Sequence, residues 1–505
     1  MYFLVVLTFR TPFLLLRCRN IGRNNLIALF SALLFVSHPI QTEAVTYIFQ
    51  RLASLVAFFY LLSIVLYIKW RLQVTPSLTL PHQGGGKWWG ASLLYLASIL
   101  SAILAMKTKE NAFTLPIVIA LYEFFFFRGT LGKRVLHLIP FLLTMLIIPI
   151  TLIGIDKPVG EIISGIEPAT RGYEGISRAD YILTQFRVVV TYIRLLFLPV
   201  NQNIDYDYPV YHSFFDIQVF LSFLFLIFVF GSAFYFLIRS KFSPVLRFIS
   251  FGIFWFFITL SVESSVIPQY ILINEYRVYL PSMGVFTAIV NGAFLFIERL
   301  KGKKTQTAVL AFLILIPLLL SPATYNRNAV WRSTVSLWTD VVRESPLKER
   351  GHNNLGNAYM GKGLTDKAIE HFLIVLKLKP NFLEAHNNLG YAYLSKGLID
   401  NAIEQYQIAL RLKPDYAEAH YNLGVVYYKK GLLDNAIEQY QIASRLRPDY
   451  AKAHYNLGGA YLKKGFIDKA RKEFETTLKI NLDFEPARKY LMDINKTNSP
   501  YPKKQ

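Results

Sequence analysis

The sequence predicts an all-α protein in two parts, a polytopic α-helical membrane domain followed by an α-solenoid. Of its 505 residues, 53% are hydrophobic, and the mean hydropathy is positive, at +0.34. Apolar runs long enough to cross a bilayer recur from the first residues to about residue 320. From Tyr325 onward the composition becomes polar and mixed in charge, and a strict repeat of 34 residues begins.

The charge of the chain indicates membrane topology and argues against nucleic acid as a partner. The formal net charge is +21, which in a soluble protein would suggest nucleic acid. Here, however, many basic residues lie in short loops between apolar runs. Cys18 is the single cysteine, so neither a disulfide framework nor a cysteine-based zinc or redox site can form within one chain.

The apolar runs predict ten membrane spans. They cover residues 1–16, 25–38, 52–69, 88–106, 111–127, 136–155, 216–238, 247–264, 278–297 and 305–321. Five basic clusters lie in loops between them, at residues 17–23, 69–87, 128–134, 239–247 and 299–304. By the positive-inside rule, these loops face the cytoplasm.

The five basic clusters fall on alternate loops only if residues 181–199 do not cross the membrane. They carry Arg187 and Arg194, seven residues apart on one helical face, which favours a helix lying in the membrane interface over a span. The remaining loops and everything after residue 321 then lie outside the cytoplasm. We therefore predict a multi-pass protein of the cell membrane, in contact with membrane lipid, whose solenoid is extracytoplasmic.

A polar segment, SHPIQTEAVTYIFQR, separates the second and third predicted spans. Ile40 and Ala44 recur at a spacing of four, while Glu43 and Arg51 share the other side, which indicates a short amphipathic helix on the outer membrane face. Other polar residues are expected on that face, in a cavity with both signs of charge: His38, Glu110, Glu263 and Glu275, with Lys109 and Arg277. The alternative is a solvated helix that only connects two spans.

Residues 349–484 form four tandem repeats. Three kinds of residue recur every 34 positions: His352, His386, His420 and His454; Gly363, Gly397, Gly431 and Gly465; Pro380, Pro414 and Pro448. This is the tetratricopeptide signature, in which each repeat is a helix, a turn and a second helix.

The boundaries of the other parts follow from these patterns. Residues 1–324 form the membrane domain. In residues 325–348, Trp338 precedes Phe372 by 34 positions, so this segment is predicted to be the second helix of an incomplete leading repeat, which docks the solenoid on the last span. Residues 485–505 form a polar C-terminal tail.

Stacked repeats form a concave surface suited to extended polypeptide. The candidate peptide-binding residues are four asparagines, each before Leu-Gly: Asn354, Asn388, Asn422 and Asn456. An amide can donate to and accept from a peptide backbone, and the row resembles the asparagine ladder of the O-GlcNAc transferase solenoid. Alternatively, these amides only satisfy neighbouring helix groups. The recurring histidines favour repeat packing over a metal site, because no carboxylate or cysteine set stands beside them at ligand spacing.

Motifs from both parts of the chain resemble those of one protein family. They are HPIQTEAVTYIFQR at 38–51, KE at 109–110, NEYRVYLPS at 274–282, and RNAVWRSTVSLW leading into NNLG over 327–356. In this order they resemble the transmembrane and tetratricopeptide-repeat O-mannosyltransferases and their bacterial and archaeal relatives. The resemblance implies a GT-C type glycosyltransferase core. Such an enzyme takes a sugar, here mannose, from a polyprenyl-phosphate carrier and transfers it to a protein hydroxyl outside the cytoplasm.

The resemblance also implies roles for the polar residues. A lipid-phosphate donor needs cations at the outer membrane face, and Arg51, Lys109, Arg187 and Arg277 are the candidates for binding its phosphate. Transfer to a hydroxyl group needs a carboxylate base, or a bound divalent metal that does equivalent work.

The chain departs from the family pattern near its beginning. GT-C enzymes usually carry an Asp/Glu pair in the first outer loop, whereas no acidic residue precedes Glu43. Two expectations fit: the chain is N-terminally incomplete, or it is a relative without its base. Glu43, on the same predicted cavity, is the candidate catalytic residue. The alternative function is a non-catalytic, membrane-anchored scaffold for protein–protein interaction. A transporter is less favoured, since no pair of interrupted spans occupies corresponding halves.

Overall fold

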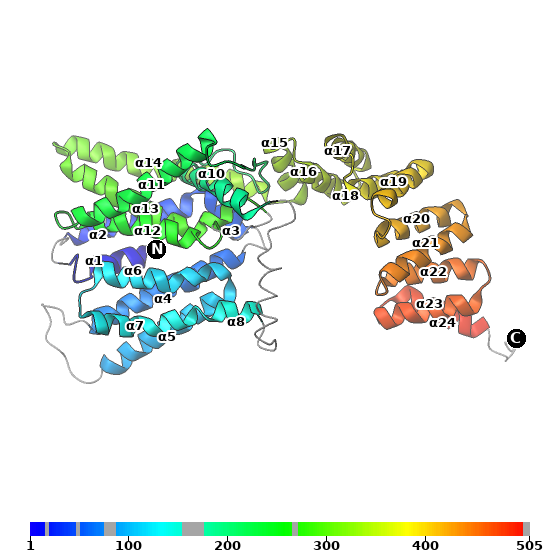
Figure 1. The fold of residues 1–505 in the computed structure, drawn as a ribbon, viewed down its shortest axis with the longest axis horizontal. Helices are drawn as coiled ribbons and strands as arrows, with labels where there is room; N and C mark the ends of the chain where they lie inside the picture. Colours follow the sequence, from blue (N-terminus) through cyan, green and yellow to red (C-terminus); the bar gives the residue numbers. More distant parts are fainter. Residues whose placement is uncertain (16–19, 47–50, 75–86, 154–175, 265–270, 498–505) are drawn as a thin grey trace. The chain divides into compact units, whose positions relative to one another are not determined.

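The chain folds into two compact units, Met1–Arg332 and Ser333–Gln505. The computed structural model describes residues 1–15, 20–46, 51–74, 87–153, 176–264 and 271–497, and Figure 1 shows their helices in chain order. Cys18, and residues 17 and 19 of the first basic cluster, lie outside the described residues.

The first unit is built from α-helices and short 3₁₀ turns (η) throughout its described residues. In chain order these are α1 Tyr2–Phe9, α2 Ile21–Ser37, η1 Pro39–Gln41, α3 Thr42–Thr46, α4 Arg51–Val74, α5 Lys87–Thr108, η3 Glu110–Thr114, α6 Leu115–Phe126, α7 Leu131–Thr144, α8 Ile147–Ile153, α10 Arg178–Phe197, α11 Ile217–Arg239, α12 Val245–Leu260, η4 Glu275–Val278, α13 Tyr279–Arg299 and α14 Lys303–Val330.

Six helical stretches of the described residues are long and apolar enough to cross a membrane. They are Arg51–Val74, Gly90–Thr108, Leu131–Thr151, Ile217–Arg239, Glu275–Arg299 and Lys303–Val330. Helix α2 together with Pro39–Thr46 makes a seventh if the two count as one span, although they bend by 61°. The bend follows from Pro39, which has no backbone N–H to continue the helix.

Three of the ten predicted spans differ from these helices. Helix α1 has 8 residues, α6 has 12 and α12 has 16, all shorter than the roughly 20 residues that a span needs. Most of their apolar side chains are buried inside the unit. These three helices are therefore apolar because they pack in the protein core. Helix α10 is not among the candidate spans either, in line with the interfacial helix expected over 181–199.

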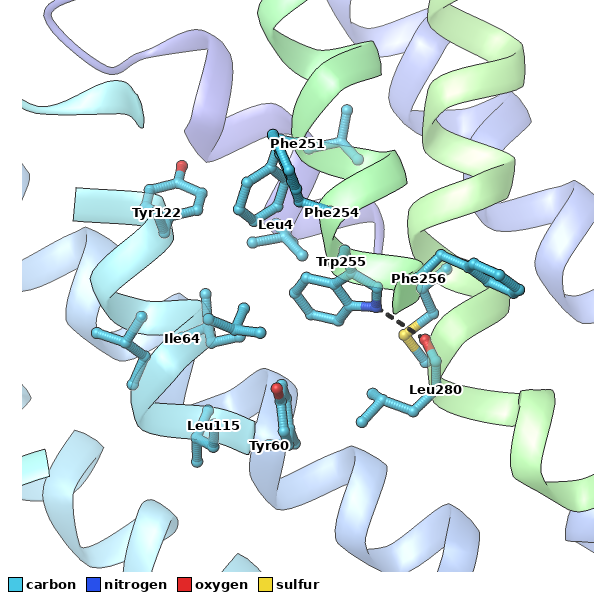
Figure 2. Close-up of a cluster of buried hydrophobic side chains, with 14 of the residues drawn as sticks. Leu4, Tyr60, Ile64, Leu115, Tyr122, Phe251, Phe254, Trp255, Phe256 and Leu280 are labelled. Atoms are coloured by element: carbon cyan, nitrogen blue, oxygen red, sulfur yellow. Dashed lines mark hydrogen bonds between the residues drawn. The ribbon is translucent and has the colours of Figure 1, made fainter. Parts of the chain in front are cut away.

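Aromatic side chains around Trp255 of α12 form the core of the first unit. Figure 2 shows the indole N–H of Trp255 donating to the backbone oxygen of Leu280 in α13, at 2.9 Å. Tyr60 of α4 meets the Trp255 ring edge-on, with centroids 5.7 Å apart, and Tyr122 of α6 meets Phe251 at 5.5 Å. Such pairs add about 0.5–1.5 kcal/mol each beyond burial, so they hold α4, α6, α12 and α13 together.

Two glycines allow α12 and α13 to cross closely. A Cβ on Gly252 would collide with the backbone oxygen of Gly284 and lie 2.9 Å from the Cβ of Ala288. A Cβ on Gly284 would lie 2.7 Å from Cδ1 of Trp255. Small residues permit the close backbone approach on which helix association in a membrane depends, because lipid is as apolar as the side chains.

Three of the predicted basic clusters converge on the C-terminal end of α6. Arg71 donates to both carboxylate oxygens of Glu123, at 3.0 and 2.6 Å. Arg134 donates to the backbone oxygen of Glu123 at 2.8 Å, and Arg247 to that of Phe125 at 2.7 Å. Cations at a helix C-terminus are favourable because the last carbonyls lack helical partners. This end of the unit is therefore stabilised by its own basic residues.

The second unit is a helical array. Its described helices are α15 Thr334–Glu344, α16 Glu349–Met360, α17 Thr365–Leu378, α18 Leu383–Ser395, α19 Ile399–Leu412, α20 Ala417–Lys430, α21 Leu433–Leu446, α22 Ala451–Lys463, α23 Ile467–Ile480 and α24 Glu485–Thr497. The turn glycine of each repeat, such as Gly363 at φ +71°, adopts the positive φ that other residues avoid.

The first helices of the repeats share one face of the array. Helix α16 contacts α18, α18 contacts α20, and α20 contacts α22. Within each repeat the two helices approach closely, since a Cβ on Gly356 would lie within 2.9 Å of three atoms of the Phe372 ring. Helix α15 packs on α16 as α17 packs on α18.

The segment expected as a polar tail begins with a helix. Residues 485–497 form α24, which packs against α23 and buries Ala487 completely. Polar residues cover the exposed side of α24, so the polar composition of this segment did not indicate a helix. Residues 498–505 lie outside the described residues.

Gly252→Ala is expected to destabilise the first unit, because the new methyl group collides with the backbone of α13. Overpacking of this kind costs about 1–3 kcal/mol, so the melting temperature of the purified protein in detergent should fall by several degrees. Gly231→Ala in α11 is the matched control, since a Cβ there meets nothing within 4 Å. Equal melting temperatures for the two variants would contradict the close crossing.

Candidate functional site

Residues 271–278 are the centre of the candidate site. This segment contains the motif NEYR at 274–277 and forms η4 just before α13. It contacts α3 and η1 and receives hydrogen bonds from α10 and from residues 202–206. Segments up to 233 positions apart in the chain thus meet at one end of the first unit.

Glu43 of α3 is bound by this segment. Its Oε2 accepts from the backbone N–H of Tyr276 at 3.0 Å, and its Oε1 accepts from the side-chain amide of Asn274 at 2.5 Å, in the amide orientation that satisfies both groups. Glu43 is only 2% exposed. A buried carboxylate is costly without hydrogen bonds, so these donors explain how α3 carries an acid into the unit.

Glu275 accepts three hydrogen bonds from a second segment. Its Oε2 accepts from Gln202 at 2.7 Å, and its Oε1 accepts from the backbone N–H of Asn203 at 2.8 Å and the hydroxyl of Tyr206 at 2.5 Å. Hydrogen bonds to a charged acceptor are among the strongest in proteins. Glu275 therefore ties residues 202–206 to η4.

Glu43 and Glu275 share a countercharge. Their carboxylates repel one another, and the guanidinium group of Arg327 in α14 attracts both. Within the described residues, no group of three or more His, Cys, Asp or Glu side chains is arranged to hold a metal ion. The two buried acids are thus satisfied by protein donors and by Arg327, and Arg277 also attracts Glu43.

A second charged pair lies beside the same segment. The Nζ atom of Lys109 is 2.5 Å from Oε1 of Glu263 and 4.1 Å from the centroid of the Tyr276 ring. The Lys109 and Glu263 side chains are 13% and 7% exposed. Tyr276 joins the two groups, because its backbone binds Glu43 and its ring supports Lys109. Among the described residues, nothing donates to Oε2 of Glu263, which distinguishes this acid from Glu43 and Glu275.

Arg277 and Tyr192 fix the backbone of the segment. The guanidinium group of Arg277 donates to the backbone oxygens of Ile271 and Leu272, at 2.8 and 3.2 Å. The Tyr192 hydroxyl of α10 donates to the Asn274 backbone oxygen at 3.0 Å and accepts from its N–H at 2.9 Å. Arg277, a predicted phosphate ligand, is 3% exposed and uses these two N–H groups to close the turn.

His38, predicted as a cavity residue, caps η1. Its Nδ1 faces the backbone N–H of Ile40 at 3.2 Å, and its Nε2 faces the backbone oxygen of Leu196 at 3.2 Å. Because a backbone N–H can only donate, Nδ1 accepts and the proton lies on Nε2. His38 therefore joins η1 to the end of α10 as a neutral imidazole.

Three other predicted residues, Glu110, Arg51 and Arg187, form no side-chain hydrogen bond or ion pair with this cluster among the described residues. Glu110 is exposed. Arg51 begins α4 and is exposed beside a surface pocket lined by Leu52 and Phe58. Arg187 on α10 is partly buried, and its Nε finds no hydrogen-bond partner in the part of the chain that the structure describes.

Several residues that build the site were not predicted: Tyr192, Gln202, Asn203, Tyr206 and Arg327. The run NQNIDYD at 201–207 was the available signal, since it is a dense polar stretch between apolar segments. Asn274 and Tyr276 stood inside a quoted motif, but nothing in the sequence indicated that they would bind Glu43 and Lys109.

An apolar pocket of about 450 Å³ opens beside Glu263. Helices α10, α11 and α12 line it with aliphatic side chains and with four aromatic ones: Phe186, Phe223, Phe230 and Phe257. Its polar lining comes from Gln185, Ser261 and Ser264. Glu263 and Lys109 do not line the pocket, but Ser264, which does, follows Glu263 directly in the chain.

The asparagines predicted to bind peptide form contacts between repeats. Asn388 donates to Asn353 at 3.1 Å, and Asn422 donates to Asn387 at 2.9 Å. Asn456 donates to a tyrosine hydroxyl at 3.1 Å. Each of these partners lies 35 positions earlier. All four asparagines, Asn354 included, are partly buried on the shared face of the first helices. In three of the four asparagines, one amide N–H is therefore already bound to a group of the neighbouring helix.

The recurring histidines join the two helices of each repeat. Each Nε2 lies 2.8–3.2 Å from the backbone oxygen of the proline six positions earlier. Each Nδ1 contacts a side chain 19 positions later, in turn His371, Gln405, Gln439 and Glu473. Only in the last repeat is that partner a carboxylate.

These features define the class of the protein: a helical membrane protein that carries an array of repeats of the kind that bind peptides and proteins. Residues 356–397, 390–431 and 427–465 match the family described as TPR repeat, and residues 451–484 match the family described as Tetratricopeptide repeat.

Similar proteins extend the likeness to the first unit. Protein O-mannosyl-transferase F38B6.6 of Caenorhabditis elegans is 24% identical over 374 residues, 70% of this chain and 46% of that protein. Protein O-mannosyl-transferase TMTC3 of Mus musculus is 22% identical over 388 residues, 71% of this chain and 40% of that protein. Protein O-mannosyl-transferase TMTC1 of Mus musculus is 31% identical over 114 residues, 23% of this chain and 12% of that protein.

This chain spans less than half the length of each of these relatives. The matches nevertheless confirm the resemblance read from the motifs. The chain is similar to the transmembrane and tetratricopeptide-repeat O-mannosyltransferases over most of its own length.

Solved structures match about a third of the chain. The crystal structure of MamA is 30% identical and covers 34% of this chain and 94% of that one, with a TM-score of 0.28. The crystal structure of YrrB, described as a TPR protein with an unusual peptide-binding site, is 22% identical and covers 34% of this chain and 86% of that one, with a TM-score of 0.28.

The contact between His454 and Glu473 is expected to make the last repeat sensitive to pH. A hydrogen bond of 2.7 Å to the Glu473 carboxylate raises the pKa of His454 above the ordinary histidine value, against the opposing effect of burial. A raised folded-state pKa means that this stabilisation is complete below about pH 6.5 and is lost as the pH rises through the folded-state value. Hydrogen exchange in residues 454–474, corrected for intrinsic rates, should therefore quicken as the pH rises above about 6.5.

Glu473→Gln is the matched control, because Gln439 occupies the same position beside His420. This variant should remove the pH dependence of exchange. A dependence that persists in Glu473→Gln would show that the ion pair is not its source.

Proposed function

We propose that this chain is a membrane glycosyltransferase, which takes mannose from a polyprenyl-phosphate carrier and transfers it to a protein hydroxyl outside the cytoplasm. The observation that carries the proposal is the Lys109–Glu263 pair on the Tyr276 ring, next to an apolar pocket. A cation, a carboxylate with one available oxygen and an apolar surface for lipid are the groups that this reaction needs. The similarity to proteins named O-mannosyl-transferases supports the same reaction class.

The donor is bound at two places in this proposal. Its prenyl chain lies in the pocket of α10, α11 and α12, against Phe186 and Phe223. Its phosphate meets Lys109, whose ammonium group has three donors and can serve Glu263 and an anion together. Arg187, which follows Phe186 and has an Nε that no described residue occupies, is the second phosphate ligand. Arg51 and Arg277 are further candidate ligands of the donor phosphate.

Glu263 acts as the general base. Its Oε2 takes the proton of the acceptor hydroxyl, whose oxygen forms a bond to C1 of the sugar. The bond from C1 to the phosphate oxygen breaks, and the polyprenyl phosphate leaves with the electron pair. Lys109 stabilises the negative charge that grows on the phosphate.

Glu43 positions the site instead of reacting. Both of its oxygens accept hydrogen bonds from residues 274–276, and it is almost completely buried. By holding the backbone of Tyr276, it holds the ring that supports Lys109. The candidate base from the sequence therefore becomes a positioning residue.

The charge distribution of the first unit supports an outward-facing site. The cluster around Glu263 lies at the end of α12, whereas Arg247 lies at its beginning. Arg71 likewise closes the far end of α4. By the positive-inside rule, the arginine end faces the cytoplasm and the site faces outward. We place the protein in the cell membrane, with repeats that bind the acceptor or a partner on the outer side.

Glu263→Gln is expected to lower mannose transfer from radiolabelled polyprenyl-phosphate mannose by about 10²–10⁴-fold, the usual contribution of a general base. Glutamine keeps the size of the side chain and an oxygen that accepts from Lys109, so the variant should still fold, with a lower melting temperature because Lys109 loses its countercharge. Glu110→Gln, an exposed carboxylate next to Lys109 in the chain, is the matched control and should retain transfer. Full transfer by Glu263→Gln would remove Glu263 from the chemistry.

Glu43→Ala is expected to lose both transfer and stability. The Tyr276 N–H and the Asn274 amide would lose their shared acceptor, and a buried unsatisfied donor costs about 1–3 kcal/mol. The melting temperature should therefore fall together with activity. If transfer disappears while the melting temperature is unchanged, Glu43 is the base and the role proposed for Glu263 is wrong.

A non-catalytic scaffold is the second candidate function. It is favoured by the burial of Glu43 and Glu275, which accept hydrogen bonds from Tyr276 and Tyr206 among the described residues. In that case the wild-type chain releases no mannose from the labelled donor, whereas its repeats still bind peptide.

A further inference from the structure

The apolar pocket between α10, α11 and α12 contains two buried polar atoms that have no hydrogen-bond partner among the described residues. They are Oε1 of Gln185 in α10 and the hydroxyl oxygen of Ser264, which follows α12. Gln185 is only 3% exposed. The other polar group of the lining, the hydroxyl of Ser261, already donates to the backbone oxygen of Ile258 at 2.8 Å. Because an unpaired buried polar atom is unfavourable, the two atoms indicate a ligand that would pair with them.

The turn at residues 271–278 fixes the orientation of the Gln185 amide. Its Nε2 donates to the backbone oxygen of Leu272 at 3.1 Å. A carbonyl oxygen can only accept, so the nitrogen faces Leu272 and Oε1 lies on the other side of the amide. Arg277 donates to the same backbone oxygen at 3.2 Å. The unpaired acceptor is therefore held by the same segment that binds Glu43.

The chemistry of the two unpaired atoms fits a hydroxyl group and does not fit a phosphate. An amide oxygen and a phosphate oxygen both accept hydrogen bonds, so they cannot pair with one another. A hydroxyl group can donate to Oε1 of Gln185 and accept from Ser264. Among the described residues, no charged side chain lines the pocket. The ligand group at this place is therefore uncharged and carries an O–H donor.

In the proposed reaction, only the sugar of the lipid donor can supply that hydroxyl, because a prenyl chain has no polar hydrogen. Both unpaired atoms lie on segments that meet at Glu263, the proposed base. Ser264 follows Glu263 directly in the chain, and Tyr181, one helical turn before Gln185, donates to the backbone oxygen of Glu263 at 3.3 Å. A sugar that presents C1 to Glu263 is therefore close to the segments that carry Gln185 and Ser264.

We infer that Gln185 and Ser264 determine which sugar the donor carries. Oε1 of Gln185 accepts from one hydroxyl of the sugar, and the oxygen of that hydroxyl accepts from Ser264. The inference rests on the proposed function, since it takes the donor to be a prenyl-phosphate sugar. A few fixed polar groups in an apolar pocket are the usual source of ligand specificity. A sugar without that hydroxyl leaves a buried acceptor unpaired, so it binds more weakly.

The test measures binding to the full chain in detergent without any acceptor, by isothermal titration calorimetry. The ligands are citronellyl phosphate mannose and four analogues, each of which lacks one of the four free hydroxyl groups of the mannose. One analogue should bind the wild-type chain about 5- to 100-fold more weakly than the parent ligand, which is the effect of one buried acceptor left unpaired.

Gln185→Met, which has a side chain of similar size, should bind that analogue as tightly as the parent ligand. The variant should fold, because Leu272 keeps its hydrogen bond from Arg277. Ser264→Ala should reduce the discrimination against the same analogue. Gln218→Met is the matched control and should keep the discrimination of the wild-type chain, because Gln218 is an exposed glutamine of α11 that does not line the pocket.

Three results would overturn the inference: no binding of the mannosyl ligand, equal affinity of the wild-type chain for all five ligands, or discrimination that persists in Gln185→Met. Citronellol, which has a hydroxyl group but no sugar, should bind equally to the wild-type chain and to Gln185→Met. Weaker binding of citronellol to the variant would assign the hydroxyl to a prenyl alcohol and would also overturn the inference. Mannose transfer without discrimination contradicts this inference alone, whereas discrimination without transfer contradicts only the proposed function.

Discussion

A charge buried in an apolar unit has to be paired, and residues 271–278 are where the first unit meets this requirement. Tyr276 and Asn274 bind the carboxylate of Glu43, while Glu275 receives three donors from residues 202–206. The same segment carries the ring on which Lys109 rests. Every charged group of the site is positioned through this one short turn, so its backbone is the feature on which the site depends.

The rest of the first unit holds that turn in place. The close crossing of α12 and α13 at Gly252 positions the start of α13, which follows η4 directly. Tyr192 of α10 fixes the backbone of Asn274 by two hydrogen bonds. At the other end, Arg71 and Arg134 close the C-terminal end of α6. The polarity of the unit is therefore concentrated at two opposite ends, with an aromatic core between them.

The repeat array also pairs its polar groups, and it does so with the same contacts in successive repeats. Each repeat satisfies polar groups of the next through an asparagine and a lysine, and a histidine joins the two helices within it. Among the described residues, the recurring polar groups of the array are therefore satisfied mainly by contacts from one repeat to the next.

The sequence by itself determined the fold class and the repeat register, because these depend on periodicity and local spacing, and its motifs contain Glu43 and Lys109. It predicted ten spans, whereas six or seven helical stretches of the described residues are long and apolar enough, since an apolar run looks the same whether its helix is mostly exposed, as α11 is, or mostly buried in the unit, as α6 is. Only the tertiary structure shows which carboxylate oxygens of the site accept hydrogen bonds from the protein. The donor to Glu43 lies 233 positions away in the chain, and no local pattern reports a contact at that distance.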